Sequence, residues 1–163
     1  MPNFNYTIDV MSKDGQHKLM SILMIDTIKL CGNTDFTLNP FKSVDDKTPS
    51  FSSVREQMMA KLNLIDLENK LKTISSSNVT YILVGGHFPV YSIASHGSTQ
   101  CLIDNIMPLL HKYRVSAYLS GHDHNLQHIS HTFLNATVEY MVTGANSVNS
   151  FYFDLRAFYF KIF

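Results

Sequence analysis

The sequence "YILVGGH", from Tyr81 to His87, points to the fold, because it is a short apolar run that ends in two glycines and a histidine. A continuous apolar run of this length is typical of a strand buried on both faces. The sequence "SAYLSGHDH", from Ser116 to His124, repeats the pattern, with an aspartate between two histidines. A helical stretch separates the two runs, and this alternation of strand, helix and strand predicts parallel strands in an α/β layer.

Further strands are indicated on either side of this unit. Strand formers fill residues 5–10 and 18–26, with an Asp-Gly turn signal at 14–15 between them, so we predict a hairpin. Residues 126–133 and 138–144 are also rich in strand formers and predict two more strands.

Two helices and one long loop complete the expected fold. Residues 27–50 are polar and turn-rich, and predict a surface loop. Ser53 and Glu56 form a capping box that opens a helix. A second helix is expected over 101–113, where Pro108 either kinks or restarts it. The apolar face of the first helix is expected at Val54, Met58, Leu62, Ile65 and Leu71.

The composition of the 163 residues is that of one globular domain. Lys plus Arg and Asp plus Glu both total 13, so the zero net charge argues against a nucleic-acid partner or an acidic membrane surface. No apolar run approaches the ~18 residues that a membrane span needs. The amino terminus has neither a basic start nor an apolar core, so we expect no signal peptide.

Three Asn-x-Thr tripeptides and two cysteines give information on the cellular compartment of the protein. Asn5, Asn78 and Asn135 are candidate N-glycosylation sites, although each tripeptide arises easily by chance. Cys31 and Cys101 are too few for a disulfide-rich scaffold, and the sequence leaves open whether they form one bridge or two buried thiols.

Histidines follow both buried strands at the point where each strand ends. Because ligands of an open α/β sheet lie beyond the carboxyl ends of its strands, we expect His87, His122 and His124 to converge there. Neutral imidazole binds zinc and iron well, so we predict a metal site in preference to three ordinary polar loop residues. The spacing of His122 and His124 lets Asp123 point away and make a structural hydrogen bond. The chain is expected to bend at the glycines before these histidines, Gly85, Gly86 and Gly121.

Longer blocks around these histidines resemble a known family. The blocks are "MIDTIKLCGNTDF", "ILVGGHFPVYSIASHG", "CLIDNIMPLLHKYRVSAYLSGHDHNLQHI" and "EYMVTGANS". They resemble the carboxyl-terminal half of the tartrate-resistant acid phosphatases, the small animal purple acid phosphatases of the calcineurin-like metallophosphoesterase superfamily. The resemblance covers about residues 6–149. It implies that 1–163 is a single partial domain, the carboxyl-terminal half of an α/β two-sheet sandwich flanked by helices.

The aromatic tail at 150–163 departs from the family's more polar ending. It is interpreted either as a buried terminal strand or as an artefact of splicing or of the gene model, and the sequence does not choose between the two.

The resemblance also implies roles for individual residues. His87 and His122 match ligands of the divalent ion in a dinuclear centre of Fe(III) with Fe(II) or Zn, and His124 matches a ligand of the ferric ion. His96 matches a catalytic histidine that binds phosphate or protonates the leaving group. Cys31 and Cys101 match a disulfide, and the family is secreted or lysosomal.

Three metal-ligand motifs of the family, "GDWG", "GDNFY" and "GNH", do not occur in this sequence. We therefore expect at most a partial metal site. The expected function is that of an acid phosphatase, which hydrolyses phosphate monoesters with a metal-bound hydroxide, and we expect this chain to be inactive alone. The alternatives are a non-catalytic secreted module that binds a metal or phosphate, and a structural chain that pairs with a complementary amino-terminal half.

Overall fold

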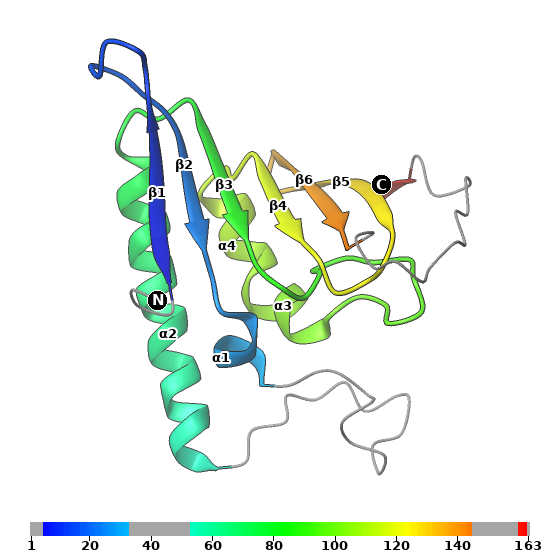
Figure 1. Cartoon of the computed structure of the whole chain (residues 1–163). Helices are drawn as coiled ribbons and strands as arrows, with labels where there is room; N and C mark the ends of the chain where they lie inside the picture. The colour runs from blue at the N-terminus through cyan, green and yellow to red at the C-terminus, as the bar shows by residue number, and fades with distance from the viewer. Residues whose placement is uncertain (1–4, 33–52, 145–159, 163) are drawn as a thin grey trace.

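The computed structural model describes residues 5–32 and 53–144, together with the backbone of 160–162. Within these residues strands and helices alternate much as the sequence predicts (Figure 1). In chain order the elements are β1 (Tyr6–Met11), β2 (Lys18–Met24), α1 (Thr27–Cys31), α2 (Val54–Ser75), β3 (Tyr81–Gly85), α3 (Gln100–Asn105), α4 (Met107–Lys112), β4 (Ala117–Ser120), β5 (Leu126–Phe133), β6 (Ala136–Thr143) and β7 (Phe160–Ile162).

The strands of the described residues form one mixed sheet in the order β1-β2-β3-β4-β6-β5-β7. Its centre is parallel, because β2, β3, β4 and β6 all run the same way. The predicted hairpin forms antiparallel β1 and β2, and Gly15 in its turn has a φ of 71°. The α/β class is therefore confirmed, and the described residues supply one sheet of the expected sandwich.

Helices cover one face of this sheet (Figure 1). Buried strand residues and buried helix residues form a single core on that side. Packing is dense enough that Tyr118 and Tyr140 are almost fully buried. The core includes Leu23, Val84, Tyr118, Val138 and Tyr140 from the sheet, and Leu67, Leu71, Leu102, Ile106 and Leu110 from the helices.

The other face of the sheet carries no helix in the described part of the chain (Figure 1). Side chains alternate along a strand, and directly paired residues share a face. Because Val84 and Tyr118 point into the helix-side core, their neighbours Leu83 and Leu119 belong to this open face. Ile8 on this face is 47% exposed. Toward β5 the same face also carries polar side chains, those of Glu139, His128 and Ser130. We call the following set the open face: Ile8, Val10, Met20, Ile22, Leu83, Leu119 and Met141.

The prediction of a surface loop over residues 27–50 is wrong at its start, because residues 27–31 form the short helix α1. The side chain of Asp26 caps this short helix, and its Oδ1 accepts from the backbone N–H of Ile28 at 3.1 Å and of Lys29 at 3.0 Å. An aspartate before three apolar or amphipathic residues is thus an N-cap signal. Residues 33–50 lie outside the described residues.

The predicted start of α2 is confirmed, since Ser53 Oγ accepts from the Glu56 N–H at 3.3 Å. The predicted apolar face is wrong at four of its five positions. Val54 is 76% exposed and Ile65 is 57% exposed, whereas Leu67 and Leu71 are fully buried. The helix is turned so that a different set of apolar residues, mostly in its carboxyl-terminal half, packs against the core. The exposed set is Val54, Met58, Leu62 and Ile65, and the buried set is Ala60, Leu67, Leu71 and Ile74.

Pro108 restarts the second predicted helix, which is split into α3 and α4 at Ile106. Proline lacks an N–H and so fits the first turn of a new helix. The disulfide that the resemblance implied is confirmed between Cys31 and Cys101, with their Cα atoms 5.8 Å apart. It joins the end of α1 to the start of α3.

Only the last part of the aromatic tail is described, as β7, which pairs parallel to β5. Residues 145–159 lie outside the described residues, so neither interpretation of the tail is decided.

Candidate metal centre

Two predicted ligands, His87 and His122, meet beyond the carboxyl ends of β3 and β4. The two strands run parallel and side by side, so the residues that follow them emerge at the same edge of the sheet. Nδ1 of His122 lies 3.2 Å from Nε2 of His87. The ring of His96 lies 4.6 Å from the ring of His122, between centroids. The structure thus brings three of the four predicted site histidines together.

The sequence predicts that the backbone bends at the glycines before the histidines, but the left-handed residue of this segment is a histidine instead. None of Gly85, Gly86 and Gly121 is among the residues with positive φ, whereas His122 itself has a φ of 64°. Gly86 is needed for another reason, since a Cβ there would lie 2.5 Å from the hydroxyl of Tyr118. Close packing against Tyr118 therefore explains why position 86 is a glycine, and the left-handed backbone conformation is adopted by the candidate ligand His122.

Asp123 makes the structural hydrogen bond that was expected of it. Its carboxylate is 1% exposed and accepts from the hydroxyl of Ser92. Gln127 Nε2 donates to the same Ser92 hydroxyl at 2.9 Å, and Gln127 Oε1 accepts from the backbone N–H of Ile93 at 2.9 Å. These bonds tie the loop after β3, which carries His87 and His96, to the segment after β4, which carries His122 and His124.

Sequence reasoning did not find Ser92 and Gln127. Both are buried polar residues. The available signal was the alternation along the predicted strand, which puts Gln127 on the same face as the apolar Ile129. A buried amide there must find hydrogen-bond partners. Gly144 was also missed as a tight position, since a Cβ there would overlap the carbonyl group of Asp123.

The third predicted ligand, His124, is exposed. Within residues 5–32 and 53–144, no three side chains of His, Cys, Asp or Glu lie close enough together to hold a metal ion. The described residues therefore do not fit a dinuclear centre by themselves. They offer one imidazole pair with a third imidazole beside it, and the metal and catalytic roles of these histidines stay predictions.

The candidate glycosylation sites differ in accessibility. Asn5 is buried, and its side chain donates to Asp66 at 3.4 Å. Asn78 and Asn135 are exposed, at turns where φ is 51° and 57°. A glycan needs an exposed amide, so in this conformation Asn78 and Asn135 are the accessible candidates.

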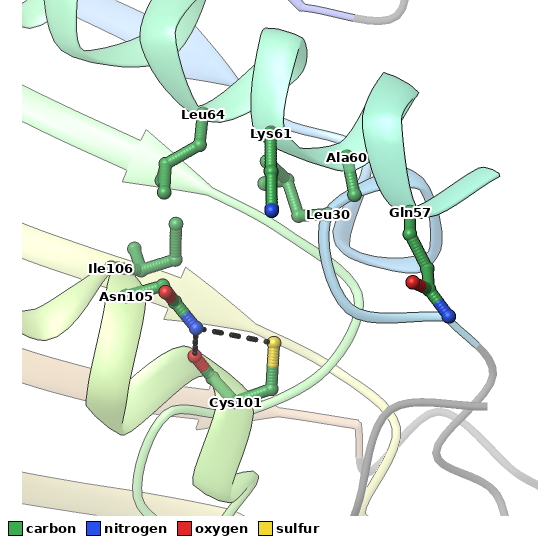
Figure 2. Close-up of a pocket in the computed structure, with 8 residues that line it drawn as sticks. All are labelled: Leu30, Gln57, Ala60, Lys61, Leu64, Cys101, Asn105 and Ile106. Atoms are coloured by element: carbon green, nitrogen blue, oxygen red, sulfur yellow. Dashed lines mark hydrogen bonds between the residues drawn. The ribbon is translucent and has the colours of Figure 1, made fainter. Parts of the chain in front are cut away.

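A cavity of about 320 Å³ lies apart from the histidines, between α2 and the start of α3 (Figure 2). Figure 2 shows Asn105 bonded to the backbone oxygen of Cys101, at 2.9 Å, on one wall of this cavity. The wall is mostly apolar, and its one charged group is the amine of Lys61. The lining residues are Leu30, Gln57, Ala60, Lys61, Leu64, Cys101, Asn105 and Ile106.

Curated relatives of the chain are acid phosphatases. Over 128 residues it is 41% identical to tartrate-resistant acid phosphatase type 5 of Mus musculus and 40% identical to that of Homo sapiens. Each match covers 78% of this chain and 35% of the relative. Purple acid phosphatase 17 of Arabidopsis thaliana is 30% identical over 131 residues, which are 80% of this chain and 36% of that protein. The chain thus spans about a third of the length of these relatives. No family model matches it.

Two solved structures share the fold. Purple acid phosphatase PPD1 from yellow lupin aligns with a TM-score of 0.52 and 14% identity, over 86% of this chain and 23% of that one. GAP50, the anchor in the inner membrane complex of Plasmodium, aligns with a TM-score of 0.56 and 22% identity, over 86% of this chain and 38% of that one. At these identities the likeness shows the fold alone. Among the described residues, no helix has the length and apolar character to cross a membrane.

Proposed function

Because this chain is homologous over most of its length to part of the purple acid phosphatases, we propose that it carries the histidine-bearing part of a phosphate monoester hydrolase site. His87 and His122 hold a metal ion in this proposal. His96 lies beside them to bind the phosphate or to protonate the leaving group. The family implies a dinuclear metal centre. The described residues lack a third close ligand, so the remaining ligands come from elsewhere in the complete enzyme.

The observation that carries this proposal is the approach of two imidazole nitrogens, His122 Nδ1 and His87 Nε2, to 3.2 Å at the ends of two parallel strands. Two nitrogens at 2.0–2.1 Å from a tetrahedral zinc ion would stand roughly 3.3 Å apart. The backbone of the site is also held together, since Gly121 N–H donates to the carbonyl of His87 at 3.1 Å. This spacing supports the proposal that the two imidazoles share one ion.

We further propose that the open face binds the rest of a purple acid phosphatase polypeptide. It has apolar residues on five strands, β1, β2, β3, β4 and β6, and the described residues place no helix on it. A large exposed apolar patch usually marks an interface or an aggregation hazard. The relatives are about three times as long as the matched region, so they contain the chain that such a face would need.

A secretory or lysosomal location follows from the same proposal. The Cys31–Cys101 disulfide supports it, because disulfides persist in oxidising compartments. The exposed Asn78 and Asn135 offer acceptors for glycans there.

Elemental analysis of the purified chain, with hydrolysis of p-nitrophenyl phosphate at acidic pH, tests the enzymatic proposal. We expect bound transition metal that His122→Asn removes, with turnover absent or weak. Asparagine tolerates the left-handed φ of position 122, so this variant removes the ligand without adding strain. His17→Asn, at an exposed position in the hairpin, is the matched control. Equal metal in wild type and His122→Asn would overturn the metal role. Metal binding that never supports turnover, even with the complementary segment present, would favour a non-catalytic binding module.

Co-expression with the region of the mouse relative that lies outside the 128 matched residues tests the partner proposal. We expect a 1:1 complex in analytical ultracentrifugation, and we expect Ile22→Lys to prevent it. Lys61→Ala, an exposed change on the helical side, should have no effect. A chain that stays monomeric, ignores the complementary region and exposes no apolar surface to a hydrophobic dye would contradict the proposal.

A further inference from the structure

The outer side of α2 carries a stripe of apolar side chains that the core does not use. Four residues form it, each at least 53% exposed, and we call them the α2 stripe: Val54, Met58, Leu62 and Ile65. At about 3.6 residues per turn they fall within roughly 80° of one another around the helix. Leu67 and Ile74, which pack in the core, lie on the opposite side. Single exposed apolar residues need no explanation, whereas a continuous stripe often marks an interface.

The spacing of the α2 stripe matches a second copy of the same helix that runs antiparallel to it. In an antiparallel pair with a two-fold axis, the same surface patch serves both chains. When the axis crosses the helices at the level of Ala60, Val54 meets Ile65 of the second copy. Met58 then meets Leu62 of the second copy, so each of the four side chains covers another. The stripe is therefore complementary to itself.

Charged residues at the edge of the α2 stripe fit the same register. Arg55 directly follows Val54, and Asp66 directly follows Ile65. Both charged residues lie on the same flank of the stripe, and like flanks meet in a two-fold pair. The antiparallel register therefore places Arg55 beside Asp66 of the second copy, and the symmetry repeats this pair. Within one chain the two residues are roughly 16 Å apart along the helix, so they cannot bond each other.

Both charged groups are accessible for this contact. Arg55 is exposed, and the side chain of Asp66 is 50% exposed. Asp66 already accepts from Lys70 and from Asn5, in both cases through Oδ2. A carboxylate has acceptor sites on both of its oxygens, so these bonds leave room for Arg55 of the second copy. Opposite charges across an interface fix its register more than they add to its strength.

We propose that α2 pairs antiparallel with α2 of a second copy of this chain, through the α2 stripe and with an Arg55–Asp66 ion pair at each end. The contact covers about three turns of helix, less than a standard interface, so we expect a weak, reversible dimer that forms as the concentration rises.

The dimer contact is separate from the open face. The helices cover one face of the sheet, and the open face is the other (Figure 1). Pairing through α2 therefore leaves the open face available to the partner proposed above, and two such complexes would join at high concentration. This inference goes beyond the phosphatase site and does not depend on it.

Sedimentation equilibrium of the full chain over a concentration series tests the role of the α2 stripe. We expect a monomer–dimer equilibrium, and we expect Met58→Lys to weaken it at least about tenfold, because a charge would be buried in an apolar contact. Ile22→Lys makes the same kind of change on the open face, so it is the matched control and should keep this dimer. It also separates the α2 dimer from association through the open face.

Charge reversal tests the register of the pair. Arg55→Asp places two carboxylates beside each other in the dimer, and Asp66→Arg places two guanidinium groups there. Each variant alone should therefore dimerise at least about tenfold more weakly than the wild type. An equimolar mixture of the two variants should dimerise again, because position 55 of each chain then faces the opposite charge at position 66 of the other.

Wild-type and Ile22→Lys chains that both stay monomeric over the series would overturn the dimer, and so would a mixture of the two charge variants that does not associate. A thermal melt checks that each variant folds. If Asp66→Arg does not fold, cross-linking decides instead. Val54→Cys mixed with Ile65→Cys should give a disulfide-linked pair, whereas Val54→Cys alone should not, and absence of the mixed pair would overturn the proposal. No arm uses a metal or the complementary region, so failure of this dimer is distinguishable from failure of the proposed function.

Discussion

His122 meets two demands at once, because it is a candidate ligand and it adopts a left-handed backbone conformation with a φ of 64°. That conformation costs a residue other than glycine about 1 kcal/mol. The ring is held by contacts to the rings of His87, Phe88 and His96. Backbone strain of this kind concentrates at functional sites, and here a glycine would relieve the strain but remove the imidazole.

Ser92 is predicted to matter for stability although it is neither a ligand nor apolar. Asp123 Oδ1 has no hydrogen-bond partner among the described residues, so the hydroxyl of Ser92 is the main support of a buried carboxylate. Ser92→Ala should lower the free energy of unfolding by about 2 kcal/mol, the cost of a buried acceptor left without its donor. Urea unfolding measures this, and Ser95→Ala, an exposed serine of the same loop, is the control. Equal effects of the two variants would refute the role of Ser92.

Gly144 should tolerate no side chain. A Cβ at 144 would overlap the carbonyl group of Asp123, whereas a Cβ at Gly121 would meet nothing within 4 Å. We expect Gly144→Ala to cost about 2 kcal/mol through overpacking and to displace the loop of His122. Gly121→Ala should be close to neutral. Chemical unfolding and zinc binding of both variants provide the comparison, and a neutral Gly144→Ala would show that the contact is absent.

The elements themselves follow from local patterns, whereas their orientation depends on what covers them. Every predicted strand from 5–10 to 138–144 forms, because apolar runs and turn signals are local. The buried side of α2 could not be predicted, since a sequence with apolar residues on two sides does not say which side meets the sheet. Among the site residues, strand ends placed His87 and His122 correctly, while the position of His96 beside them rested on resemblance alone.

The two faces of α2 should respond differently to truncation. Leu67→Ala removes a fully buried side chain and should cost about 3 kcal/mol. Leu62→Ala removes one that is 53% exposed and should change stability by less than about 0.5 kcal/mol. Thermal unfolding of both variants tests the orientation of the helix. A large loss at Leu62 would mean that the originally predicted face is the buried one.

The disulfide should carry a large share of the chain's stability. It joins α1 to α3 across 70 residues, and restricting the unfolded chain over such a loop contributes ~4 kcal/mol. Cys31→Ser with Cys101→Ser should therefore shift the urea midpoint strongly downward. Reduction of the disulfide in the wild-type chain should lower the urea midpoint by the same amount. A urea midpoint that neither the double substitution nor reduction changes would show that the bridge does not form.

At the scale of the whole molecule, the two faces of the sheet differ in what covers them among the described residues: helices pack on one face, and no helix lies on the other. The helical side holds a continuous core with a disulfide beside it. Among the described residues, the open face has no helix on it and the His87–His122 pair has no third close ligand. In the function proposed above, the same further stretch of a phosphatase polypeptide completes both.

The proposed site requires His87 and His122 to bind one metal ion together. Imidazole ¹⁵N spectra of the chain, recorded during a zinc titration, measure this binding at each ring nitrogen. We expect the His122 Nδ1 and His87 Nε2 signals to move together, and we expect His122→Asn to abolish the response of His87. Signals of these two histidines that stay unchanged at saturating zinc, in a folded chain, would contradict it.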